Sequence, residues 1–145
     1  MKLSKEFYNG VIIFLGIGLY FLLMNVLGFA NVFYLRFLNV VFVFYGVNKT
    51  AQMNLAEGEK DFISNAVSAM ITSLVGVLLS VIGLVIYSYI KGGDAYVQSL
   101  SETFLFGGNP SVMTYSICLL FEGIASSVIV TLLVMLYWNN RYPAD

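Results

Sequence analysis

Residues 62–90 read FISNAVSAMITSLVGVLLSVIGLVIYSYI, a stretch without one charged side chain. About 20 mostly apolar residues are enough for a helix to cross the roughly 30 Å hydrocarbon core of a bilayer. Backbone N–H and C=O groups find no partners in hydrocarbon, so a segment of this kind has to satisfy them within a helix. The stretch therefore predicts a transmembrane helix, with enough length to tilt.

Three further apolar segments predict additional spans, at about residues 7–27, 32–47 and 112–138. The first is longer than the roughly 7–15 apolar residues of a signal peptide, so we expect it to be retained as a helix. Only a few residues separate the first two spans, which therefore form an antiparallel hairpin. We predict an all-α fold: one integral membrane bundle of four transmembrane helices, comprising residues 1–145.

Composition supports the membrane class and argues against several functions. Of the 145 residues, 59% are hydrophobic and 10% are charged, whereas soluble domains carry about 25% charged residues. The net charge is −1, so there is no basic surface for nucleic acid. The chain has no histidine and a single cysteine, Cys118, which argues against haem, zinc and catalytic triads. We expect no cofactor, no metal site and no enzymatic activity.

Two polar segments connect the later spans. The segment Asn48–Asp61 is too polar to lie in lipid, and we expect a solvated loop there. Between the third and fourth spans, Tyr96, Val97, Leu100 and Phe104 follow helical spacing. This spacing predicts a short interfacial helix, with Asp94 as its cap.

The distribution of basic residues predicts the orientation. One side of the membrane would hold five of them (Lys2, Lys5, Lys49, Lys60 and Arg141), and the opposite side two (Arg36 and Lys91). Basic residues concentrate on the cytoplasmic side. We therefore expect both termini in the cytoplasm, with the protein in a bacterial inner membrane.

Small residues recur along the third span at steps of three and four, at Ala66, Ala69, Ser73, Gly76, Ser80 and Gly83. Such spacing places them on one face, and small residues let helix backbones approach closely in lipid. The pattern predicts a helix-packing seam. Its partner is either another span or a second protein, and a ligand or pore lining is the lesser alternative.

Glu122 lies about ten residues into the fourth span, near the middle of the bilayer by the helical rise per residue. An ionisable group at that depth costs roughly 2.5–3.5 kcal/mol on insertion scales, so it should face protein or find a partner. Arg36 and Asn39 on the second span are candidate partners. Glu122 either couples transport of a proton, cation or cationic substrate, or anchors the helices structurally, or contacts a missing subunit.

Some local features carry a family resemblance. They are Tyr45-Gly46-Val47 at the end of the second span, the polar loop running into Asp61-Phe62-Ile63-Ser64, and the small-residue third span. With these features the chain resembles an uncharacterised family of small bacterial four-span membrane proteins. That family has no established activity, so the resemblance implies an architecture and no site.

The sequence favours an accessory or scaffolding subunit, packed against other membrane subunits or against itself within the lipid bilayer. The alternative is a small oligomeric transporter or channel that uses Glu122. A lipid-acting enzyme ranks last, because Asp94 and Glu102 are only scattered candidates for catalysis.

Overall fold

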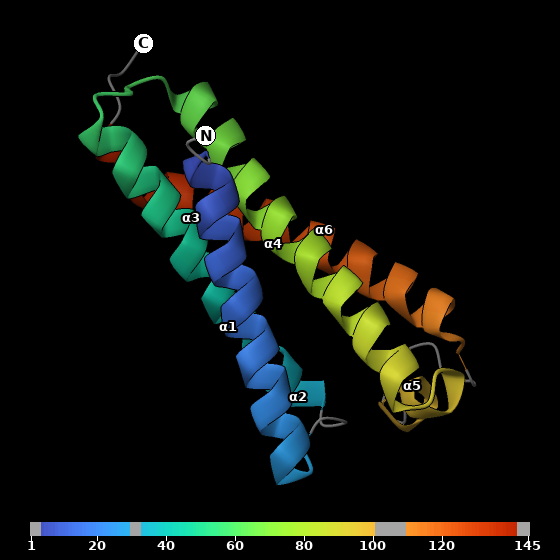
Figure 1. The fold of residues 1–145 in the computed structure, drawn as a ribbon. Helices are drawn as coiled ribbons and strands as arrows, with labels where there is room; N and C mark the ends of the chain where they lie inside the picture. The colour runs from blue at the N-terminus through green and yellow to red at the C-terminus, as the bar shows by residue number, and fades with distance from the viewer. Residues whose placement is uncertain (1–3, 30–32, 101–109, 142–145) are drawn as a thin grey trace.

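The computed structural model describes residues 4–29, 33–100 and 110–141, and every regular element in that part of the chain is a helix (Figure 1). The predicted all-α class is confirmed there. Three helices are long and apolar enough to cross a membrane: α1 (Lys5–Leu27), α4 (Phe62–Lys91) and α6 (Val112–Tyr137). Their ends agree with three of the predicted spans to within two residues at each end.

The remaining predicted span is represented by two helices, α2 (Phe33–Arg36) and α3 (Asn39–Ala56), with a turn at residues 37–38 between them. The predicted start at residue 32 lies outside the described residues. The helix continues well past the predicted end at residue 47, through most of the expected loop. α3 is not among the helices that are apolar enough to span a membrane by length and composition.

Buried polar residues explain why α3 continues. Thr50 and Asn54 are 0% and 3% exposed, because α3 packs against α1, α4 and α6 at once. Asn9 Nδ2 donates to Thr50 Oγ1 over 2.9 Å, and the Thr50 and Thr72 hydroxyls lie 2.8 Å apart. Protein atoms therefore supply Thr50 with the hydrogen bonds that lipid would deny its hydroxyl.

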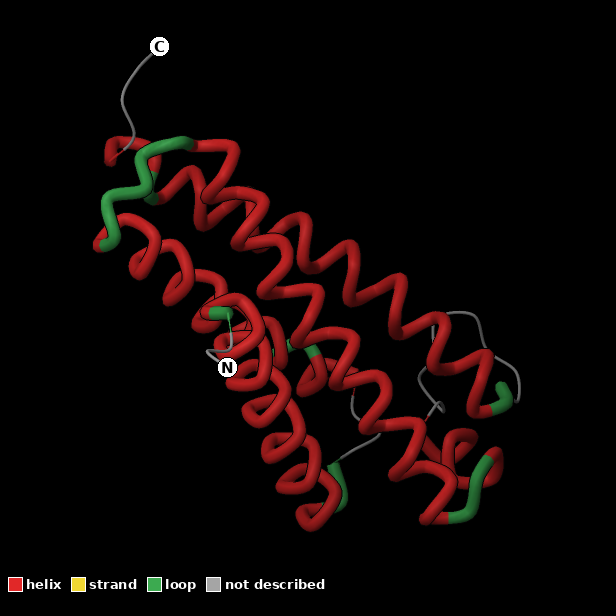
Figure 2. The backbone as a smooth tube through the Cα atoms, turned by 45° about the horizontal axis from the view of Figure 1, so that its top comes forward, coloured by secondary structure: helices red, strands yellow, loops and turns green. Residues whose placement is uncertain are grey.

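The helices meet tightly at one end of the bundle and diverge at the other (Figures 1 and 2). The closed end gathers the start of α1, the end of α3, the start of α4 and the end of α6. Lys5 forms an ion pair with Glu57 there, and Trp138 Nε1 donates to Asn48 Oδ1 over 2.7 Å. At the opposite end, the backbones of α1 and α2 diverge from those of α4, α6 and the short helix α5 (Asp94–Leu100), and side chains such as Asn25 and Arg36 bridge between them.

The small-residue seam of α4 packs inside the bundle. Ala69 and Ser73 have no exposed surface, and Gly76 lies against Ile13 of α1. Ala66, Ser80 and Gly83 are half-buried. Of the two partners that the sequence left open, the structure therefore provides a helix of the same chain.

Two aspartates cap helices. Asp61 accepts from the amide and hydroxyl of Ser64 at 2.9 and 2.7 Å at the start of α4. The Ser64 hydroxyl, and then its amide, hold the pKa of the Asp61 carboxyl below its ordinary value. Asp94 departs from the prediction: it is the first residue of α5, and its carboxylate accepts from Val112 N over 2.8 Å, at the start of α6. Phe104 lies outside the described residues.

Candidate functional site

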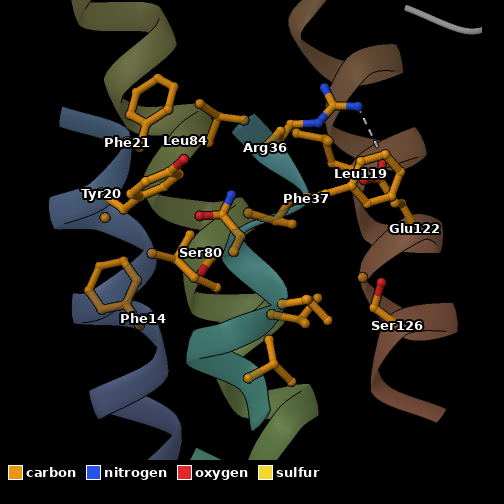
Figure 3. A pocket seen from close by; sticks show the side chains of 18 of the residues that line it. Phe14, Tyr20, Phe21, Arg36, Phe37, Ser80, Leu84, Leu119, Glu122 and Ser126 are labelled. Carbon is orange, nitrogen blue, oxygen red and sulfur yellow. Dashed lines mark hydrogen bonds and ion pairs between the residues drawn. The ribbon is translucent and has the colours of Figure 1, made fainter. Parts of the chain in front are cut away.

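A groove of about 570 Å³ opens where the helices diverge (Figure 3). All of α1, α3, α4 and α6 contribute to its walls, and most of its lining is aromatic or aliphatic, including Phe14, Phe21, Leu84 and Leu119. Small-molecule sites in proteins fall in the range of roughly 300–1,000 Å³ and are lined mainly by apolar groups, with a few polar groups among them. The groove has the size and character of such a site.

The polar residues that the sequence singled out are brought together on this groove. Arg36, Asn39 and Glu122 all line it, although they come from α2, α3 and α6. Figure 3 shows Arg36 extending from its own segment toward Glu122 on the neighbouring helix. The approach of these two helices, which lie far apart in the sequence, creates the site.

Arg36 and Glu122 form an ion pair. The distance between Nη2 and Oε2 is 3.4 Å, and Arg36 Nη1 also donates to the Tyr115 hydroxyl over 3.1 Å. Hydrogen bonds between ions of this kind are usually about 2.7–2.9 Å long. The pair is therefore loose.

The two members of the pair differ in exposure. The Arg36 side chain is 22% exposed, and that of Glu122 is 45% exposed. Within the described part of the chain, Arg36 is the one hydrogen-bonding or ionic partner of Glu122. The Glu122 carboxylate consequently keeps capacity to accept from a further donor.

Asn39 is not a partner of Glu122. It is the first residue of α3, and its Oδ1 atom is buried without a hydrogen-bond partner. Leaving a buried acceptor unsatisfied costs roughly 1–3 kcal/mol. The wall of the groove thus contains an unsatisfied acceptor, at a residue that the sequence had suggested as a partner of Glu122.

The amide of Asn25 and two tyrosine hydroxyls form a hydrogen-bonded cluster near the groove, which the sequence did not indicate. Asn25 Nδ2 donates to the hydroxyls of Tyr87 and Tyr96 at 2.7 and 3.2 Å, and Tyr87 also lines the groove. The two rings meet edge-on with centroids 5.7 Å apart. Burial raises the pKa of the Tyr96 hydroxyl to about 12. Three segments far apart in the sequence meet here, and no local pattern in any one of them indicates the contact.

The C-terminal part of the small-residue seam of α4 also contributes to the wall of the groove. Ser80 and Gly83 line the groove, and a Cβ atom on Gly83 would lie 3.0 Å from the Phe14 ring. Cys118 is half-buried and free. Among the described residues, no three side chains of His, Cys, Asp or Glu gather as metal ligands. The groove-lining residues offer ionic and hydrogen-bonding contacts, from Arg36 and Glu122 among others, within largely apolar walls.

Comparison of the chain with protein-family models, curated proteins and solved structures finds no match. The resemblance to a family of small bacterial four-span membrane proteins therefore stays a prediction.

Proposed function

We propose that this chain is a small non-enzymatic membrane protein that binds a lipophilic cation in the groove, as a transporter would. The observation that carries the proposal is the half-exposed Glu122 carboxylate, held by one loose ion pair on an apolar ligand-sized groove. A carboxylate with spare accepting capacity in such surroundings favours a cation. An apolar ligand body would in turn fill the aromatic and aliphatic walls.

Aromatic rings add to the preference for a cation. Phe14, Tyr20 and Phe21 of α1 line the groove across from Glu122 (Figure 3). The faces of such rings attract cations, and the attraction is stronger where water is excluded. An entering cation has to compete with Arg36 for the carboxylate. The Tyr115 hydroxyl, which already accepts from Arg36, offers the displaced guanidinium a remaining partner.

The accessory-subunit function receives less support. A seam free to pack against another protein would support it, but in this chain Ile13 and Phe14 of α1 pack against the seam. Large apolar side chains do cover the outside of the bundle, but lipid accounts for such a surface as readily as a partner does.

We further propose that the protein lies in a bacterial inner membrane with four crossings and both termini in the cytoplasm. The α2–α3 segment would make the fourth crossing. The closed end gathers Lys5, Lys49, Lys60 and Arg141, and Arg36 and Lys91 belong to the diverging end. This distribution supports a cytoplasmic closed end.

Binding of tritium-labelled tetraphenylphosphonium to the protein in lipid nanodiscs tests the proposed function. We expect saturable binding that empty nanodiscs lack. Glu122→Gln should weaken it at least about tenfold, because removing a partly desolvated charge from a binding site is costly. Glu57→Gln is the matched control, since Glu57 also pairs with a cation but lies away from the groove. Equal binding by the Glu122→Gln variant and the wild type would overturn the proposal.

Uptake into proteoliposomes then separates transport from binding alone. A protein that transports should accumulate tetraphenylphosphonium inside the vesicles when an opposing proton gradient is imposed. Binding without accumulation would limit the function to ligand capture.

A further inference from the structure

We infer that the groove prefers amphiphilic amines carrying N–H donors over quaternary ammonium ions, and that Asn39 determines this specificity. The inference rests on the proposed function and narrows its ligand class. It starts from two oxygen acceptors on one groove: the Glu122 carboxylate, which is incompletely engaged, and the Asn39 amide oxygen, which has no partner.

The amide oxygen of Asn39 is buried in the wall of the groove without a hydrogen-bond partner, so a ligand donor has to enter that wall to reach it. Asn39 begins α3, and the cap residue before it, Leu38, makes no side-chain capping hydrogen bond. The groove-lining residues that follow on α3 are Val40, Val43 and Phe44, which offer no side-chain donor. A water molecule at such a site would itself need about two to four polar partners. The side chains of Val40, Val43 and Phe44 supply none of them.

The chemistry of the ligand follows from these acceptors. A protonated primary or secondary amine offers positive charge for Glu122 and N–H donors for the Asn39 oxygen. A quaternary ammonium ion offers charge but no donor, so it leaves Asn39 unsatisfied. Sites built to hydrogen-bond a group discriminate against analogues that lack it, because the buried protein group then stays unpaired. An alkyl chain on the amine would occupy the apolar walls formed by Phe14, Phe21 and Leu84.

Displacement of bound tetraphenylphosphonium in nanodiscs tests the inference, with dodecylamine and dodecyltrimethylammonium as the two competitors. The two probes share their charge at neutral pH and their chain length, and they differ in N–H donors. For the wild type we expect dodecylamine to displace the label at concentrations about tenfold lower, the value of one hydrogen bond to a buried acceptor. In Asn39→Leu, the ratio of the displacement constants of the two competitors should fall close to the value set by their partitioning into lipid.

Two control variants accompany Asn39→Leu. Asn39→Asp retains an acceptor oxygen at the same place and should keep the preference for dodecylamine. This result would show that a loss of preference in Asn39→Leu reflects the missing oxygen and not misfolding. Asn54→Leu, a buried change on α3 away from the groove, is the matched control. The ratio of the two displacement constants in each variant is compared with that of the wild type, so differences in lipid partitioning cancel.

The outcomes separate this inference from the proposed function. If both competitors displace the label with the same ratio in the wild type and in Asn39→Leu, Asn39 does not select the ligand and the inference is overturned. The proposed function would survive that result as long as Glu122→Gln still weakens binding of tetraphenylphosphonium. If tetraphenylphosphonium does not bind at all, the proposed function itself fails.

Discussion

Gly76 of α4 lies directly against Ile13 of α1: a Cβ atom on Gly76 would fall 2.6 Å from Cγ2 of Ile13 and 3.3 Å from the carbonyl oxygen of Gly10. Ile13 has no exposed surface, so neighbouring residues restrict its movement. The contact lets α4 cross α1 at close range. Beyond this crossing the two helices diverge, and the groove begins there.

Gly76→Ala should therefore destabilise the bundle. We expect the free energy of unfolding to fall by roughly 1–3 kcal/mol, the usual cost of inserting extra atoms into a filled core. Unfolding in mixed detergent micelles, followed by circular dichroism, measures the change. Gly18→Ala is the control, because a Cβ atom there meets nothing within 4 Å. Equal stability of the two variants would show that α1 and α4 do not pack as described.

Much of this packing was predictable from the sequence. Small residues at regular spacing predicted the seam, and the apolar runs predicted the ends of α1, α4 and α6, where Gly28, Asp61 and Gly92 mark three of the boundaries. The identity of the partner helix was not predictable. Whether α1 or a second protein packs on Gly76 depends on side chains such as Ile13, which no local pattern connects with α4.

The extent of α3 could not be predicted for a related reason. Composition indicates a loop after Val47, since Thr50 and Asn54 are polar. The environment of Thr50 depends on Asn9 and Thr72, which belong to other helices and make its position a buried hydrogen-bonded site, and Asn54 is buried farther along α3.

Thr50→Val tests this buried network. The change keeps the shape of the side chain and removes the hydroxyl that joins Asn9 to Thr72. Hydrogen bonds between membrane helices average about 0.6 kcal/mol and reach about 1.7 kcal/mol. We expect a loss of stability of roughly 1–2 kcal/mol, because one substitution removes two such bonds.

Thr131→Val is the matched comparison for Thr50→Val. Thr131 is 3% exposed, and its Oγ1 atom has no hydrogen-bond partner. Replacing that hydroxyl by a methyl group removes an unsatisfied polar group, so the stability should stay the same or rise. A Thr131→Val variant that loses as much stability as Thr50→Val would mean that shape, and not hydrogen bonding, explains both.

The site was predicted in part. Because Glu122 is the one charged residue within an apolar predicted span, the sequence indicated that it needs a partner. Arg36 was a candidate because it is the one basic residue of the second predicted span, residues 32–47. The groove itself escaped prediction, because it arises from the divergence of α1 and α4 and not from any residue pattern. The separate role of Asn39 escaped it as well, since Asn39 lies only three residues after Arg36 and was expected to share its contact.

The Tyr96 hydroxyl should lose its proton only at an unusually high pH. Its pKa of about 12 reflects burial, which disfavours the phenolate. Because folding raises this pKa, the neutral Tyr96 phenol stabilises the packing of α5 fully at pH values below the ordinary tyrosine pKa of about 10. That contribution is lost as the pH rises toward 12 and beyond.

Ultraviolet titration of tyrosinate in the wild type and in Tyr96→Phe isolates this group. The difference between the two curves should show one transition near pH 12. A Tyr96 transition near pH 10, the ordinary value for tyrosine, would show that the cluster with Asn25 and Tyr87 is open to water.

Cysteine labelling in oriented vesicles tests the four crossings, in a Cys118→Ser background that removes the native thiol. Single cysteines at Ser4, Glu59 and Lys91 mark the start of α1, the loop before α4 and the end of α4. With four crossings, the first two react from the cytoplasmic side and the third from the opposite side. If the α2–α3 segment does not cross, Glu59 moves to the far side of the membrane and Lys91 joins Ser4. The ion pair between Lys5 and Glu57 favours the first outcome, because it requires both ends of the α1–α3 hairpin on one side.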